Sequence, residues 1–211
     1  MTISRVAALA ITVVFAVQLN AEVVTLTAQN AGNYTSFLGS ELHDPNNTLV
    51  ANSNGFVSNS YLVFDLGTIG DTIVSLDLAG SSGGDAARTD DVEIEFSSFS
   101  GSVSQLVGGT LNTNDLENGV GYGGFFADAT FPDDSPFSLT LNPTAVEDAN
   151  DSAGLFVIAA TQPIVTGTSG FLGDVRANEF TLTVTTAIPE PTSLPVLAGL
   201  AIGFVVCRRK R

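Results

Sequence analysis

The feature that most constrains the fold of this chain is an alternation of apolar and polar residues at every second position. It is clearest in the segments 91–96, 137–141 and 180–185, where serine, threonine or acidic residues separate phenylalanine, leucine, isoleucine and valine. A period of two places successive side chains on opposite faces of a β-strand. Each segment is therefore predicted to be a half-buried strand.

Other segments show weaker strand patterns, and glycine, asparagine and proline turns separate them. One short helix is predicted over Pro143–Ala153, with Asn142 as its N-cap and Gly154 just past its end. These elements favour an all-β fold, a single antiparallel β-sandwich of about eight strands that is jelly-roll-like and carries one short helix. The weaker strands are expected at 23–27, 61–66, 73–78, 124–131 and 155–160.

The N-terminus has the layout of a secretory signal peptide. One cation, Arg5, precedes the apolar stretch Val6–Val17, and a short polar break ends in the small residue Ala21. As a helix the apolar stretch would extend about 18 Å, which is too short for a bilayer core of about 30 Å. We therefore predict that residues 1–21 are removed by cleavage after Ala21.

The body that follows, residues 22–187, is strongly acidic. From residue 22 to residue 188 the chain has 21 acids and only two cations, Arg88 and Arg176, which gives a net charge of −19. Such a body should avoid nucleic acid and anionic lipid, because both are polyanions. Its partners are expected to be neutral, cationic or bridged by divalent ions. The only cysteine is Cys207, so the body can form no disulfide.

The C-terminal segment 188–211 combines three features in a fixed order. Pro189, Glu190 and Pro191 form a rigid triplet, an apolar segment of about 192–207 follows, and the chain ends in a basic cluster. The apolar segment would span about 24 Å as a helix, which is marginal for a lasting anchor. The basic cluster should stay in the cytoplasm and halt export. It consists of Arg208, Arg209, Lys210 and Arg211.

This order of triplet, apolar segment and basic cluster resembles the PEP-CTERM sorting signal of Gram-negative bacteria. The resemblance implies that Pro189, Glu190 and Pro191 are recognised and cut nearby by an exosortase-like membrane enzyme. The chain would then be exported through the inner membrane, held there transiently, and passed to the cell surface or the extracellular matrix. An ordinary short membrane anchor, with the triplet as a linker, is the alternative.

A second resemblance lies inside the body and carries no chemistry. The strand Ser60–Leu66, which ends in Phe-Asp-Leu, and the strand Asp71–Leu78 after a short polar loop are similar to a segment found in many proteins with this sorting signal. Asp65 and Asp77 are interpreted as residues at a strand end or on a strand surface.

Several motifs of enzymes are matched by spacing alone. Gly80–Gly84 fits G-x-S-x-G, but the only histidine, His43, comes before it, so a glycine-rich loop is the better interpretation. Gly119–Gly124 fits G-x-G-x-x-G but lacks a preceding strand and a following helix, so a hairpin turn is predicted. His43 is expected to be exposed in a loop, and a lone histidine cannot form a typical zinc site.

Acidic pairs are plentiful, and hard calcium ions prefer such oxygen ligands, but none of the pairs fits an EF-hand loop. We therefore predict no catalytic residue, no cofactor and no metal site, with Ca²⁺ left open. The function expected is that of a non-catalytic surface or matrix protein associated with exopolysaccharide. The alternatives are a carbohydrate- or Ca²⁺-binding module and an exported hydrolase. Sugar binding is unsupported by the aromatic residues, because the chain has no tryptophan and only three tyrosines. The pairs are Asp90 with Asp91, Asp133 with Asp134, and Asp148 with Asp151.

Overall fold

The structure, a computed structural model, describes residues 21–53, 55–81, 92–127, 135–163 and 179–188. The signal segment before residue 21, the triplet, the apolar segment after it and the basic cluster lie outside these ranges. Residues Glu22–Ala187 form one compact unit. Both hydrophobic cores lie within it, so the unit contains the contacts on which its fold depends.

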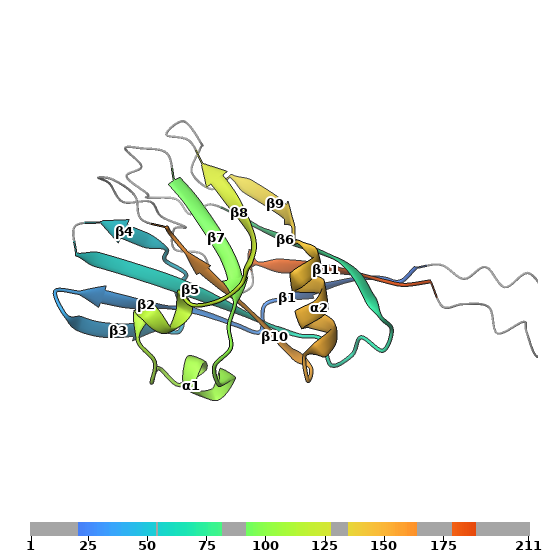
Figure 1. The fold of residues 1–211 in the computed structure, drawn as a ribbon, viewed down its shortest axis with the longest axis horizontal. Helices are drawn as coiled ribbons and strands as arrows, with labels where there is room; N and C mark the ends of the chain where they lie inside the picture. The colour runs from blue at the N-terminus through green and yellow to red at the C-terminus, as the bar shows by residue number, and fades with distance from the viewer. Residues whose placement is uncertain (1–20, 54, 82–91, 128–134, 164–178, 189–211) are drawn as a thin grey trace, which may run out of the picture. The chain divides into compact units, whose positions relative to one another are not determined.

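The body is an all-β sandwich of two antiparallel sheets, as the sequence predicts. The four-stranded sheet has the order β1-β11-β6-β9, and the seven-stranded sheet has the order β3-β2-β5-β10-β7-β8, with β4 paired to β5 (Figure 1). The strands are β1 Val23–Thr27, β2 Asn30–Phe37, β3 Ser40–Asp44, β4 Ala51–Ser53, β5 Phe56–Asp65, β6 Ile73–Ser81, β7 Val92–Ser98, β8 Gly121–Ala127, β9 Pro136–Thr140, β10 Leu155–Thr161 and β11 Thr181–Thr186.

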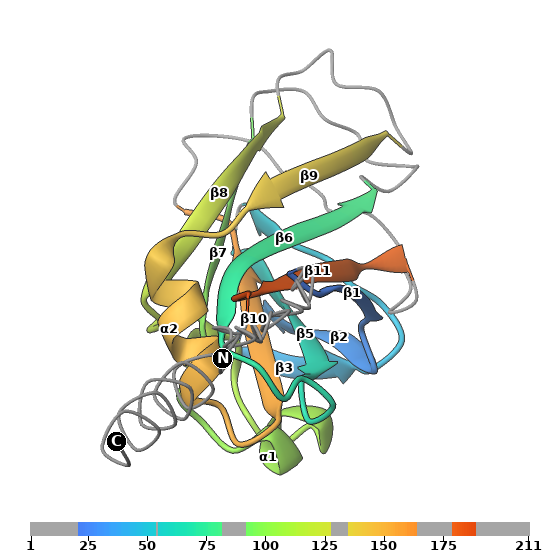
Figure 2. The same cartoon turned by 90° about the vertical axis from the view of Figure 1, so that its right-hand side faces the viewer.

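Alternating strand residues build the main core between the two sheets. In Figure 2 the four-stranded sheet lies in front of the seven-stranded one. Leu182 and Val184 of β11 and Leu76 and Leu78 of β6 are fully buried in this core, opposite Phe64 of β5. Burying side chains of this size stabilises the fold by about 1.5 to 3 kcal/mol each. The alternating threonines of β11 at 181, 183 and 185 remain more accessible, which confirms the predicted alternation.

Helix α2, Pro143–Asp151, packs against β6 and β8 and contributes Ala145 and Ala149 to the main core. It begins as predicted, because the Asn142 side chain accepts a hydrogen bond from the Ala145 N–H. It ends at Asp151, two residues before the predicted end. Gly154, with φ of +108°, lies in the turn that leads into β10.

A second, smaller core covers the other face of the seven-stranded sheet. The connection from β7 to β8 carries the short helix α1, Val103–Val107, and the 3₁₀ helix η1, Thr113–Leu116. Leu106 and Leu116 from these helices pack on Tyr34, Tyr61 and Val157 of the sheet. The sequence analysis predicted neither helix, because each is shorter than two helical turns and shows no readable period.

The prediction of about eight strands was too low, since the described residues form eleven. Strands β2, β3 and β4 were missed because their side chains do not alternate. The central residues of β2 are buried on both faces, between the main core and the second core. The predicted strand 124–131 begins earlier, at Gly121, and its residues after Ala127 lie outside the described ranges.

Candidate functional site

Both ends of the body are fixed at one corner of the four-stranded sheet. The Thr186 N–H donates to the Glu22 carbonyl at 2.9 Å, and the Ala187 N–H donates to the Thr72 carbonyl at 2.7 Å. The chain is therefore held up to Ala187, two residues before Pro189, and the predicted signal-peptide cleavage after Ala21 falls beside the same hydrogen bonds. This corner joins the body to both predicted sorting segments.

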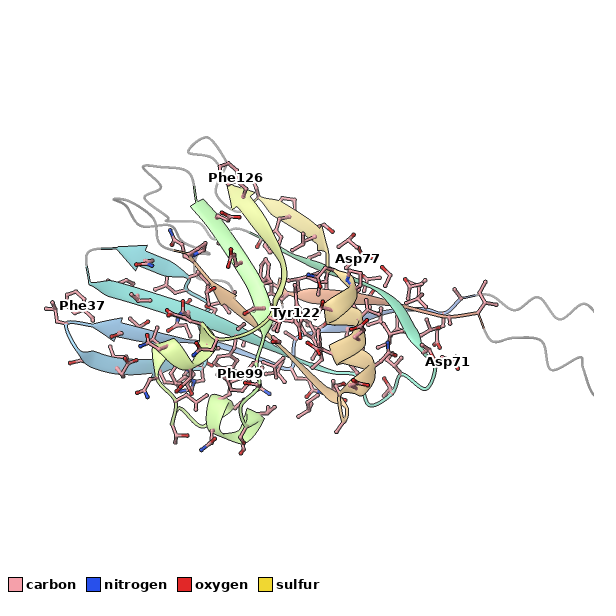
Figure 3. All side chains as sticks on the ribbon, in the orientation of Figure 1. Phe37, Asp71, Asp77, Phe99, Tyr122 and Phe126 are labelled. Atoms are coloured by element: carbon pink, nitrogen blue, oxygen red, sulfur yellow. The ribbon has the colours of Figure 1, made fainter. Side chains whose placement is uncertain are left out.

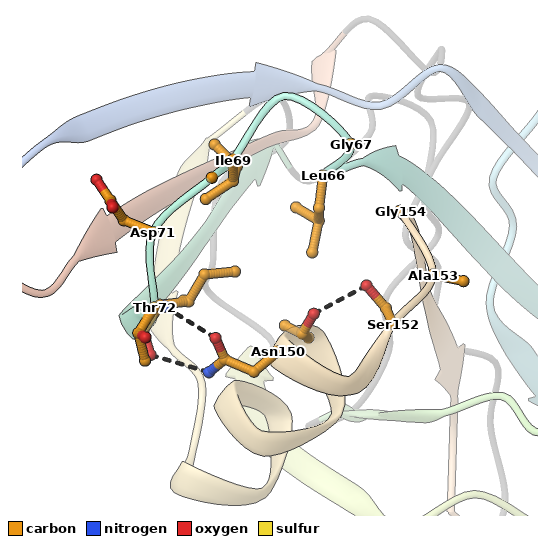
Figure 4. Close-up of a pocket in the computed structure, with 12 residues that line it drawn as sticks. Leu66, Gly67, Ile69, Asp71, Thr72, Asn150, Ser152, Ala153 and Gly154 are labelled. Carbon is orange, nitrogen blue, oxygen red and sulfur yellow. Dashed lines mark hydrogen bonds between the residues drawn. The ribbon is translucent and has the colours of Figure 1, made fainter.

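A pocket of about 470 Å³ opens beside this corner. It lies between the loop that connects β5 to β6 and the C-terminal end of α2, and Thr72 forms part of its wall (Figure 4). The side chains of Leu66, Ile69 and Ile73 supply apolar surface, and Asp71 supplies the carboxylate. The remaining lining residues are Gly67, Gly70, Ala149, Asn150, Ser152, Ala153 and Gly154.

Asn150 holds the two walls of this pocket together. Its side-chain oxygen accepts from the Ile73 N–H at 2.9 Å, and its amide nitrogen donates to the Ile73 carbonyl at 3.0 Å and to the Val146 carbonyl at 2.9 Å. The Ser152 hydroxyl donates to the Ala149 carbonyl at 2.8 Å in the same wall. The carboxamide of Asn150 therefore fixes the end of α2 to the first residue of β6.

The lining of this pocket combines polar groups with apolar side chains. Its lining contains two hydroxyls, those of Thr72 and Ser152, and no imidazole, thiol or cation. Nucleophilic catalysis by a hydroxyl needs a neighbouring base, and Asp71 makes no described contact with either hydroxyl. The arrangement can hold a small neutral ligand through hydrogen bonds and apolar contact.

A second pocket, of about 340 Å³, lies between α2 and the residues that follow β7. Figure 3 labels Tyr122 and Phe99, which both line it. The buried Tyr122 hydroxyl donates to Asp148 at 2.8 Å. Burial and this bond to a carboxylate raise the pKa of Tyr122 above its ordinary value. Asp151 lines the same pocket, so the structure brings together one acidic pair that the sequence singled out.

His43 was predicted to be an exposed loop residue, and this prediction was wrong. It lies in β3 and is half-buried, with its ring stacked on Tyr34 at 4.6 Å between centroids. Its Nε2 lies 3.0 Å from the Tyr61 hydroxyl. Burial lowers the pKa of His43, and burial also raises the pKa of Tyr61 to about 12. The loop prediction failed because Pro45 and the asparagines after it suggested a turn that begins only after Asp44.

Of the two glycine motifs, residues 80–81 and 121–124 lie in strands. Gly80 and Ser81 end β6 instead of forming a loop, and residues 82–84 lie outside the described ranges. The predicted hairpin turn at 119–124 was also wrong, since Gly121–Gly124 belongs to β8. Gly123 has φ of +141° where the pairing with β7 shifts register, so glycine permits an irregularity in the strand.

The other acidic residues that the sequence singled out do not form a site among the described residues. Asp65 ends β5 and accepts from Gln29, while Asp77 lies in β6 and accepts from Thr140, as expected of strand-end and strand-surface residues. Across the described ranges, no group of three or more histidine, cysteine or acidic side chains could hold a metal ion. The pairs at 90–91 and 133–134 lie outside those ranges.

Aromatic platforms for sugar rings are not supplied by the tyrosines. Tyr34, Tyr61 and Tyr122 are each at most 2% exposed. Within the described part of the chain, none of the helices has the length and apolar character needed to cross a bilayer. No protein-family model matches the chain, and no curated protein matches it.

Sequence reasoning missed Asn150 and the corner at Thr72. Asn150 acts on Ile73, a residue 77 positions away, and a single asparagine near a helix end gives no sign of such a partner. The pairing of β1 with β11 could have been suspected only from their similar alternation, because strand order follows from packing and not from local pattern.

Proposed function

We propose that this chain is an exported, non-catalytic β-sandwich protein of the cell surface or extracellular matrix, sorted by its C-terminal segment. The observation that carries the proposal is the order of the triplet Pro189–Pro191, the apolar segment and the four terminal cations. An exosortase-like membrane enzyme would recognise the triplet. The released or attached body would then associate with exopolysaccharide.

The body supports this proposal by its charge and its ends. Its net charge of −19 disfavours polyanionic partners. In the described part of the chain, the hydrogen bond from the Ala187 N–H to the Thr72 carbonyl lies two residues before the triplet. An extended segment read by an enzyme would therefore start directly at the edge of a folded sheet.

The test is the variant Glu190→Ala in the native host, because Glu190 is the only charge in the triplet. We expect the uncut precursor to accumulate in the inner membrane. Glu147→Ala, which removes an exposed carboxylate from α2, is the matched control and should be processed normally. Wild-type processing of the Glu190 variant would refute sorting through this triplet.

A second candidate function is calcium or sugar binding at the pocket of Asp148 and Asp151, which is favoured by the two carboxylates lining it. Cell fractionation with a pull-down on matrix polysaccharide, with and without Ca²⁺, separates the candidates. Binding that disappears with EDTA would favour the calcium-dependent module, and calcium-independent retention would favour the matrix protein.

A further inference from the structure

Among the described strands, β3 is an exposed edge strand of the seven-stranded sheet. It is the outermost strand in the sheet order, and its partner among the described strands is β2. Four of its five residues are exposed, and Leu42 at its centre is 64% exposed. Natural proteins usually protect such an edge, because its main-chain groups can pair with another strand.

The turn that leads into β3 carries a second apolar side chain at a conformational cost. Leu38 and Gly39 form a two-residue turn with φ of +50° and +83°. Turns of this kind favour asparagine before glycine, because a leucine in this backbone region is strained. Leu38 is nonetheless 80% exposed, so the strain is not offset by burial within the body. Strain that folding does not require points to a function of the exposed side chain.

The neighbouring Phe37 extends this apolar surface. It is 47% exposed and contacts Phe56, with 6.1 Å between ring centroids. Figure 3 places Phe37 at the end of the body opposite Asp71, which lies next to the corner where the chain continues to the triplet. The turn that follows Phe37 therefore lies at the end of the body opposite the corner from which the chain continues to the triplet.

We propose that β3 pairs with β3 of a second copy of this chain, antiparallel about a two-fold axis at Leu42. In this register Leu42 faces Leu42, Glu41 faces His43 and Ser40 faces Asp44. No carboxylate opposes another and Leu42 meets Leu42, so the sequence Ser-Glu-Leu-His-Asp matches itself in polarity. A surface patch that meets its own copy in this way is the requirement of a two-fold interface.

The backbone geometry agrees with this register. In a two-residue hairpin the flanking pair, here Phe37 and Ser40, exchanges hydrogen bonds, and bonded pairs alternate along the ladder. Glu41 and His43 therefore direct their main-chain groups toward the open edge. These are the two residues that the two-fold register places opposite each other. Leu42 then meets Leu42 in a pair without hydrogen bonds, where side chains approach most closely.

Net charge sets how this dimer should respond to salt. Each copy carries −19 over the body, so the copies repel at long range although the strands match locally. Raising the salt concentration from about 0.1 M to 1 M shortens the screening length from about 10 Å to 3 Å. Association should therefore strengthen with salt, which distinguishes this interface from one held by ion pairs.

The test uses the unit from Glu22 to Ile188, which has no native cysteine because Cys207 lies in the removed tail. Leu42→Cys places two thiols across the axis, where a Cα separation of about 4.5 Å falls within the disulfide range. We expect cross-linked dimer to form at least about tenfold faster than with Val74→Cys, an exposed valine of β6, and faster still at high salt. The rates are measured by non-reducing electrophoresis.

Two further variants separate loss of pairing from loss of folding. Leu42→Lys should abolish association in sedimentation velocity runs at high salt, while Val74→Lys, with the same change of charge, should leave it intact. Leu38→Asn relaxes the turn, so it should raise the midpoint of thermal unfolding while weakening association. Equal cross-linking rates for the two cysteine variants, with circular dichroism showing both folded, would overturn the proposal. So would a monomer at every salt concentration.

Discussion

Replacing Asn150 by alanine tests whether one carboxamide holds α2 to the four-stranded sheet. The substitution removes three hydrogen bonds, to the Ile73 N–H, the Ile73 carbonyl and the Val146 carbonyl. Ile73 is buried, so its main-chain groups lose partners that water cannot easily replace. At about 1 kcal/mol for each of the two bonds to Ile73 and about 0.5 kcal/mol for the exposed bond to Val146, less about 0.5 kcal/mol gained from the higher helix propensity of alanine, the loss is about 2 kcal/mol.

The free energy of unfolding is measured by urea denaturation of the unit Glu22–Ile188, followed by circular dichroism. For a domain of this size, a loss of about 2 kcal/mol should also lower the unfolding midpoint by about 4 to 8 °C. Asn150→Asp keeps the acceptor for the Ile73 N–H but turns a carboxylate oxygen toward two carbonyls. It should therefore be at least as destabilising at neutral pH.

The matched control is Asn118→Ala, which removes one exposed hydrogen bond, to the Asn114 carbonyl. It should change the free energy of unfolding by no more than about 0.5 kcal/mol. If Asn150→Ala costs as little as this control, Asn150 is not the residue that joins the pocket walls. The pocket would then not be a fixed feature of the fold.

Two predictions concern His43 and its neighbour. Burial lowers the pKa of His43, although Asp44 opposes this; the unfolded chain therefore takes up the proton first, and stability should fall as the pH drops below about 6.5. Between pH 7.5 and pH 5.5, the free energy of unfolding measured by urea titration should fall more for the wild type than for His43→Gln. Equal falls would contradict the lowered pKa of His43. Gly109→Ala should cost at least about 2 kcal/mol, because φ is +72° and the added Cβ would lie 2.5 Å from His43 Nδ1. Gly39→Ala, with φ of +83° and no neighbouring atom near the added Cβ, should cost about 1 kcal/mol. If thermal denaturation shows the same loss of stability for both variants, the close contact between residue 109 and His43 is wrong.

The sequence was sufficient to predict the sandwich because its clearest signals come from strands with one face in the core. In β11, Leu182 and Val184 are buried while threonines fill the alternate positions, and this contrast is visible without any partner. The start of α2 was equally readable, since an N-cap asparagine followed by proline acts within one turn. Patterns of this kind depend only on residues close together in the chain, so they can be recognised from the sequence alone.

Strand β2 and His43 show where this reasoning fails. Buried residues on both sides of β2 belong to two different cores, and the second core exists only because the connection from β7 to β8 folds back over the sheet. His43 is half-buried by Tyr34, Tyr61 and the backbone at Gly109, of which the last is 66 positions away. A property that depends on such distant partners leaves no periodic trace near the residue itself.

The pairing of the first and last strands connects the fold to the proposed export. Among the described strands, β1 pairs with β11 alone, and Glu22 bonds to Thr186 across 164 positions. The chain between β1 and β11 must close into a loop before the two strands can pair, and closing so long a loop is slow. A chain that leaves the cytoplasm from its N-terminus would hold β1 unpaired until β11 has crossed. Since β11 lies between β1 and β6, completion of the four-stranded sheet depends on the strand that directly precedes the triplet.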